Sequence, residues 1–152
     1  METIDLTLAP PRRWSDTLGG IRWLPRIIDK ARAALGGRLG GYLYGQSPGD
    51  RNLLSILGTD YPGFTRIVKA APDDAAVLAA LEREFPKGVA RARRWSSRPL
   101  PLLFRPMTLM LDFDDGYIDG PLAGLRKPIS ALYGTAALLL RRILKDEAKD
   151  AL

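Results

Sequence analysis

The chain contains no histidine and no cysteine. Without imidazole or thiol groups it has no Ser-His-Asp or Cys-His nucleophilic system, no imidazole general base, and none of the zinc sites built from those ligands. A disulfide framework is excluded as well, which is typical of a reducing compartment. Oxygen, amine and guanidinium groups are the polar tools that remain, and we expect neither a metal ion nor a cofactor.

Long hydrophobic runs are also lacking. The longest apolar stretch, residues 129–140, is interrupted by Ser130, Gly134 and Thr135 and is shorter than the ~20 residues that span a bilayer. Residues 1–11 carry two acidic side chains and no basic start, so they do not resemble a secretory signal. We therefore expect a cytoplasmic protein without a transmembrane segment.

What the chain does contain is an ordinary globular balance. Its 152 residues are 46% hydrophobic and 26% charged, which predicts a single domain over residues 1–152. Within it, residues 1–17 are expected to form an irregular N-terminal arm and residues 120–152 a C-terminal helical extension that packs on the core. The net charge of +6 favours anionic partners, such as nucleic acid, anionic lipid or acidic metabolites, without choosing between them.

Apolar residues recur with helical spacing through most of the chain. Together with cap residues Ser47, Asp60 and Asp73, this spacing predicts a series of helices. The predicted helices run from residues 23–25 to 35, over 50–57, from 59–60 to 71, from 73–74 to 85, and over 87–95.

Two further elements are predicted after these helices. Alternating apolar residues over 108–113, followed by Asp115-Gly116, favour a small β-hairpin near residues 107–119. A broad apolar stripe over residues 128–149 predicts a last helix, which serves the core, self-association into a homo-oligomer, or a membrane surface. The expected fold is thus mainly α, a compact multi-helix domain with one small hairpin.

Four segments of the chain carry a family resemblance. These are Leu18–Ala33, Leu39–Tyr44, Asp50–Gly58 and Thr108–Gly116. Over roughly residues 18–118 the chain resembles the bacterial family catalogued as domain of unknown function 5069. That family has no established activity, so the resemblance implies no functional residues. Gly41 stands where an acidic residue is expected, and the C-terminal helix looks like an addition.

The first predicted helix offers a candidate anion site. Arg26, Asp29 and Lys30 share one face, where Arg26 and Lys30 could present a guanidinium and an ammonium to a carboxylate or phosphate while Asp29 orients them. Tyr42 and Tyr44 could complete the pocket. Binding of a small anionic ligand or substrate at these residues is our leading hypothesis. The alternative is a solvated helix face with weak ion pairs.

An acidic cluster is the candidate catalytic group. Asp112, Asp114 and Asp115 could perform acid/base chemistry together with tyrosine, because crowding raises the pKa of one carboxylate. A small enzyme that needs no histidine, cysteine or zinc is therefore an alternative function. Acidic residues also favour turns for conformational reasons, which is the simpler explanation.

A basic segment between Lys87 and Arg98 suggests a third function. Its arginines surround a tryptophan, the combination that neutralises phosphates and stacks on bases, so a nucleic-acid-binding module is a second alternative. Arginine stems also cover apolar surface without any such partner. The candidate residues are Arg91, Arg93, Arg94, Trp95 and Arg98.

Overall fold

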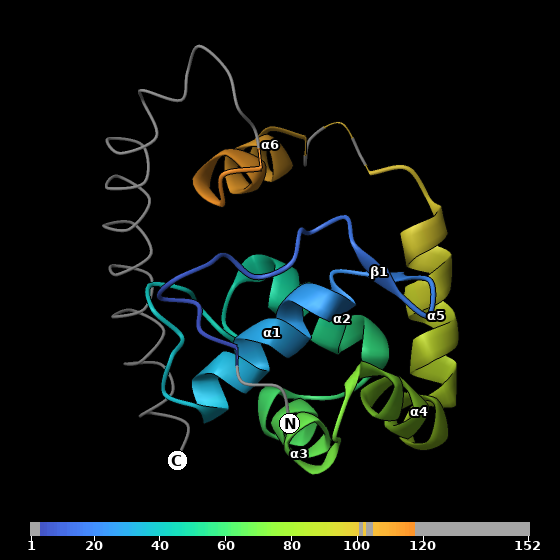
Figure 1. Ribbon diagram of the computed structural model, residues 1–152. Coiled ribbons are helices and arrows are strands. Elements are labelled where there is room, and N and C mark those ends of the chain that lie inside the picture. Colours follow the sequence, from blue (N-terminus) through green and yellow to red (C-terminus); the bar gives the residue numbers. More distant parts are fainter. Residues whose placement is uncertain (1–3, 101, 103–104, 118–152) are drawn as a thin grey trace, which may run out of the picture.

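The computed structural model describes residues 4–100, 102 and 105–117 (Figure 1). These residues form six helices and one two-stranded sheet, so the predicted mainly α fold is confirmed. Residues 4–16 contain neither a helix nor a strand and run across the core between α1 and α6 (Figure 1). The predicted helix over 128–149, and the extension from residue 120 that contains it, lie outside the described residues.

The sheet is a short hairpin near the N-terminus. Strand β1 (Thr17–Leu18) pairs antiparallel with β2 (Ile21–Arg22). Gly19 and Gly20 join them with φ values of 57° and 78°. Both angles are positive, as the tight turns that match strand twist require, and glycine adopts them without steric cost.

The first helices confirm the boundaries that the cap residues predict. Helix α1 spans Leu24–Leu35, α2 Pro48–Leu57 and α3 Tyr61–Ala70. The Ser47 hydroxyl accepts a hydrogen bond from the Asp50 amide at 3.3 Å, and the Asp60 carboxylate accepts one from the Gly63 amide at 2.8 Å. These bonds satisfy amides that have no partner within the helix.

Helices α4 (Asp74–Glu84) and α5 (Pro86–Ser97) follow with almost no loop between them. Helix α5 packs closely across α2 because residue 88 is a glycine. A Cβ atom at that position would lie 1.8 Å from the Leu57 carbonyl oxygen, far inside van der Waals contact. The absence of a side chain therefore sets the spacing of these two helices.

Helix α6 spans Arg105–Asp114, so the hairpin predicted near residues 107–119 is wrong. Its buried residues Thr108 and Asp112, with Asp115 just beyond it, follow helical spacing. Leu109, in contrast, is 58% exposed. The pattern misleads because α6 turns Thr108 and Asp112 inward, Asp112 as part of an ion pair, and leaves Leu109 and Met110 exposed. Asp115-Gly116 therefore ends a helix and does not connect two strands.

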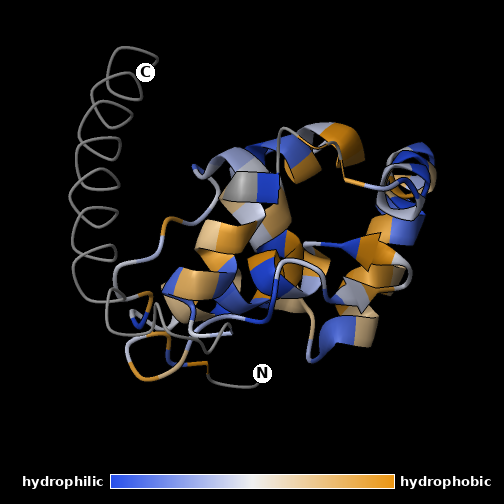
Figure 2. Ribbon diagram, turned by 90° about the horizontal axis from the view of Figure 1, so that it is seen from above, coloured by the Kyte–Doolittle hydropathy of each residue, from blue (hydrophilic) through white to orange (hydrophobic). Residues whose placement is uncertain are grey.

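The hydrophobic core lies between β2 and helices α1 to α5. Ile27, Ile28, Leu53, Phe64 and Leu81 have almost no exposed surface. Helix α5 shows mostly the hydrophilic colour, whereas the apolar stretches of the other helices gather in the middle of the molecule (Figure 2). Helix α6 lies above α1 in Figure 1, and its Leu111 packs against the edge of this core.

Candidate functional site

The charged face of α1 is buried. Arg26, Asp29, Lys30 and Arg32 are each 3% exposed, although each is ionisable. The alternative of a solvated helix face is therefore wrong. Charged side chains are rarely buried unless each is paired, because desolvation of an isolated charge is very unfavourable. The partners of this face come from segments distant in the sequence.

Lys30 is paired with Asp50 of α2. The Lys30 Nζ atom lies 2.6 Å from Asp50 Oδ1, and it also donates to the Leu43 carbonyl oxygen at 3.1 Å. The same carboxylate accepts hydrogen bonds from the Trp23 indole and the Gly45 amide, at 2.8 and 2.9 Å. Burial lowers the pKa of Lys30, and the negative charge of Asp50 opposes that shift. The side chains of Lys30 and Asp50 are 3% and 0% exposed, so the pair is shielded from solvent.

Asp29 is paired with the N-terminal segment. Its carboxylate accepts hydrogen bonds from the Arg12 amide at 2.8 Å and from the Arg12 guanidinium at 2.6 Å. Arg12 also reaches Asp74 at the start of α4, and Arg32 lies 2.7 Å from the same Asp74 carboxylate. Asp29 thus fixes residues 11–13 against α1 and does not orient Arg26 and Lys30 toward a ligand.

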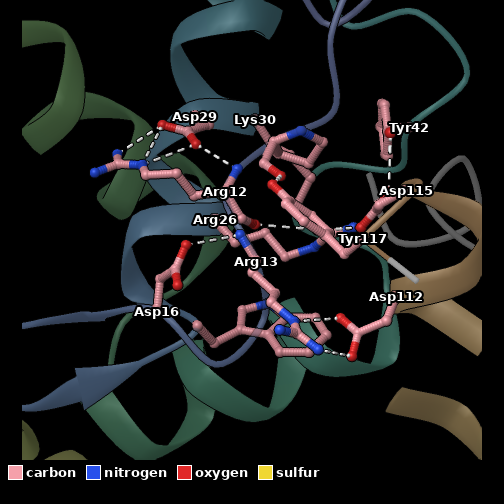
Figure 3. A network of polar contacts seen from close by, with 12 residues as sticks. Arg12, Arg13, Asp16, Arg26, Asp29, Lys30, Tyr42, Asp112, Asp115 and Tyr117 are labelled. Atoms are coloured by element: carbon pink, nitrogen blue, oxygen red, sulfur yellow. Dashed lines mark hydrogen bonds and ion pairs between the residues drawn. The ribbon is translucent and has the colours of Figure 1, made fainter. Parts of the chain in front are cut away.

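Arg26 meets Tyr42 through a carboxylate of the segment after α6. Arg26 Nη1 lies 2.6 Å from Asp115 Oδ2, and the Tyr42 hydroxyl donates to Asp115 Oδ1 at 3.0 Å (Figure 3). Burial raises the pKa of Tyr42, and the charge of Asp115 raises it further. Of the predicted ligand-binding residues, Arg26 and Tyr42 therefore converge on one anion, which the chain itself supplies.

Arg13 makes a second connection to α6. Its Nε and Nη2 atoms donate to both oxygens of Asp112, at 2.8 and 2.6 Å. The Tyr117 hydroxyl donates to the Pro11 carbonyl oxygen at 3.0 Å, and the Arg13 guanidinium lies 5.8 Å from the Tyr117 ring (Figure 3). Polar contacts thus fasten α6 to the N-terminal segment.

Tyr44 lies elsewhere. Its hydroxyl forms a hydrogen bond with Thr65 Oγ1 at 2.8 Å, and its ring contacts Tyr61 with 4.7 Å between centroids. Tyr44 is therefore a core residue at the contact with α3, and the structure does not bring it into the group around Arg26.

The acidic cluster does not converge either. Asp112 and Asp115 pair with different arginines, and Asp114 lies on the exposed side of α6. Among the described residues there is no group of acidic side chains that could hold a metal ion. The geometry gives no support for acid/base chemistry between these carboxylates.

The basic candidates on α5 divide into two groups. Arg91 donates to the Ile56 carbonyl oxygen, and Arg93 donates to the Gly19 carbonyl oxygen and to Glu82. Arg94 and Arg98 are exposed, but Trp95 is partly buried. All four arginines are thus exposed at the surface of this segment, whereas the tryptophan is partly buried.

A cavity of about 280 Å³ lies where β2, α2, α5 and α6 meet. All three tryptophans of the chain line it, from three separate segments. Arg22 is the one charged side chain among the described lining residues, and Gly49 of α2 and Met107 of α6 also line the cavity. We call this space the tryptophan cavity. The tryptophans of the cavity are Trp14, Trp23 and Trp95.

Arg22 is held firmly at this cavity. Its Nη2 atom donates to the carbonyl oxygens of Trp95 and Arg98, at 3.1 and 2.8 Å, and its guanidinium lies 5.2 Å from the Trp95 ring. The Nε atom of Arg22 and the Trp14 indole nitrogen are buried and have no hydrogen-bond partner among the described residues. Such donors are costly to leave unpaired.

Sequence reasoning missed this cavity because its walls come from residues 14 to 108. The sequence held no local signal for it, because Trp14, Trp23 and Trp95 lie far apart along the chain. The contribution of Arg12 and Arg13 was also missed, because residues 1–17 were expected to be an irregular arm. That segment supplies two of the arginines that bind carboxylates of other elements.

The fold and the site together define a small helical domain organised around a buried ionic network, with an aromatic cavity beside it. No described helix is long and apolar enough to cross a membrane. The chain belongs to the family described as domain of unknown function (DUF5069), whose sequence profile matches residues 9–101. A comparison with curated proteins gives no match.

Proposed function

We propose that this protein binds a small anionic ligand with an aromatic body in the tryptophan cavity. The observation that carries the proposal is the convergence of all three tryptophans on one cavity beside the guanidinium of Arg22. Aromatic walls favour a flat apolar group through stacking and burial. Binding is favoured over catalysis because two of the three carboxylates proposed for acid/base chemistry, Asp112 and Asp115, are each held by a different arginine.

Charge selects the sign of the ligand. Three tryptophans around a cavity could also surround an organic cation, as aromatic cages do. Here Arg22 is in the wall, and no acidic side chain is among the described lining residues. Pro48 and Gly49, the first residues of α2, also line the cavity, so the positive end of that helix dipole faces it. All these features favour an anion.

Size and hydrogen bonding limit the ligand further. A volume of about 280 Å³ lies just below the usual range for ligand pockets, about 300–1,000 Å³, which favours a molecule with one ring and one acidic group. An oxygen acceptor brought by the ligand would pair the unsatisfied nitrogens of Arg22 and Trp14 after a small side-chain shift.

Isothermal titration calorimetry with four probes tests the proposal. Benzoate and phenyl phosphate carry the ring and a negative charge, benzamide is neutral, and benzyltrimethylammonium is cationic. We expect saturable binding of one or both anions, with weaker binding of the other two probes. Tightest binding of the cation, or no binding of either anion, would contradict the proposal.

Substitutions at Arg22 and Arg94 test whether the anion binds in the cavity. Arg22→Leu removes the guanidinium at the wall, and Arg94→Leu makes the same change in charge at an exposed position of α5. We expect affinity for the anion to fall about tenfold or more in Arg22→Leu and to stay unchanged in Arg94→Leu. Arg22→Lys, which keeps the charge, distinguishes loss of charge from loss of the hydrogen bonds to Trp95 and Arg98. An equal loss of affinity in both leucine variants would show that the anion does not bind in the cavity.

A further inference from the structure

Arg26 and Tyr42 hold the Asp115 carboxylate as a receptor holds a ligand. Each carboxylate oxygen has its own donor, the Arg26 guanidinium at 2.6 Å and the Tyr42 hydroxyl at 3.0 Å. The side chains of Arg26 and Asp115 are 3% and 2% exposed, so the contact is shielded from water. Charge-assisted hydrogen bonds in such surroundings are among the stronger polar contacts in proteins.

Arg26 has contacts besides the carboxylate that hold its guanidinium in place. Arg26 Nη1 also donates to the Arg12 carbonyl oxygen at 3.1 Å, and its guanidinium lies 5.8 Å from the Trp23 ring and 5.9 Å from the Tyr42 ring. The Arg26 Nε atom is buried and has no partner among the described residues. The guanidinium therefore has a donor that Asp115 leaves unused, and another acceptor could use it.

The receptor and its occupant come from different parts of the chain. Arg26 lies on α1 and Tyr42 in the loop before α2, whereas Asp115 follows α6, 73 positions after Tyr42. Helix α1 thus buries a guanidinium whose carboxylate partner is supplied by the segment after α6. A buried cation requires an anion, whatever its source.

We infer that Arg26 and Tyr42 form a carboxylate-binding site, and that Asp115 occupies it as an intramolecular competitor of a free small carboxylate. This site differs from the tryptophan cavity, so the inference goes beyond the function proposed above. Entry of a free carboxylate would displace Asp115 and loosen the end of α6. The contacts of Arg13 with Asp112 and of Tyr117 with Pro11 would remain.

Chemical rescue of Asp115→Ala tests the site. The substitution removes the carboxylate and leaves Arg26 buried without it, so we expect the melting temperature to fall by roughly 10 °C. Sodium formate fits the space left by the carboxyl group. We expect formate to raise the melting temperature of Asp115→Ala by several degrees more than sodium chloride at equal ionic strength, with no such difference for the wild type.

Asp112→Ala is the matched control. It also removes an arginine-bound carboxylate, but its partner Arg13 has a side chain that is 41% exposed. Water can solvate that guanidinium, so formate and chloride should act alike on this variant. If formate and chloride also act alike on Asp115→Ala, the inference is wrong. Benzoate binding in the cavity would be unaffected by that result.

Hydrogen exchange of the wild type tests the competition, and it decides the matter if Asp115→Ala does not fold. Acetate must exceed the effective concentration of the tethered Asp115, which is on the order of millimolar or higher. We expect the amides of residues 105–117 to exchange faster in acetate than in chloride at equal ionic strength, while the amides of α2 do not change. Equal exchange in the two salts would overturn the competition.

Discussion

The substitution Asp50→Asn should be one of the most destabilising single changes in this protein. It keeps the shape of the side chain and removes its charge. In the native structure the carboxylate pairs with Lys30 and accepts hydrogen bonds from the Trp23 indole and the Gly45 amide, with no exposed surface. After the substitution, Lys30 remains buried without a counter-charge.

The size of the stability loss depends on Lys30, which stays buried after the substitution. Removing one partner of a buried ion pair costs about 3–5 kcal/mol, because the other charge stays desolvated. For an m-value of about 2 kcal/mol/M, the urea midpoint should fall by roughly 2 M, followed by far-ultraviolet circular dichroism. Adding Lys30→Met removes the orphaned charge, so the double variant should recover part of the loss.

An exposed ion pair provides the comparison. Arg66 and Glu84 also approach within 2.6 Å, but the side chain of Arg66 is 62% exposed. Because solvent screens this pair, Glu84→Gln should cost about 1 kcal/mol or less. A loss for Asp50→Asn no larger than that for Glu84→Gln would refute the argument that burial makes the Lys30 pair important.

Two further predictions concern packing and pH. Gly88→Ala should lower the free energy of unfolding by about 3 kcal/mol or more, because its Cβ would lie 1.8 Å from the Leu57 carbonyl oxygen. Gly41→Ala has no atom within 4 Å of its Cβ and should change that free energy by about 0.5 kcal/mol at most. Similar losses for both variants in urea denaturation would contradict this reasoning. Burial raises the pKa of Tyr44 in the folded state, so the folded state binds more protons above pH ~10 and stability should fall there as pH rises. In Tyr44→Phe this alkaline loss should be smaller, and an identical pH profile would show that Tyr44 does not contribute.

The helices of the core could be predicted because their signals are local. Ser47, Asp60 and Asp73 each cap a helix through the bond that their position predicts. Apolar spacing then identifies the buried face of each helix. These features depend on residues three or four positions apart, which a single sequence displays directly.

Helix α6 and the β1–β2 hairpin could not be predicted from local signals in the same way. The inward face of α6 includes Thr108 and Asp112, and the ion pairs of Asp112 and Asp115 are made with arginines 99 and 89 positions away. The hairpin has strands of two residues each, too short to produce an alternating pattern, and its Gly19-Gly20 turn was the only signal.

In the candidate site, too, the sequence predicted what depends on neighbouring residues and missed what depends on distant ones. The sequence places Arg26 and Lys30 on one face of a helix, and the structure confirms that spacing. The sequence does not show that Lys30 pairs with Asp50 or that Arg26 pairs with Asp115, because those ion pairs depend on how the helices pack. Helical periodicity cannot distinguish a charged face turned to solvent from one turned to buried partners.

The gathering of every tryptophan at one place gives this protein an intrinsic optical probe. Indole emission depends on local polarity and on nearby quenchers, and here no tryptophan elsewhere adds a constant background. A shift in the emission spectrum of the unlabelled protein would therefore originate at the cavity wall. Large compound collections can thus be screened by the wavelength of tryptophan emission alone.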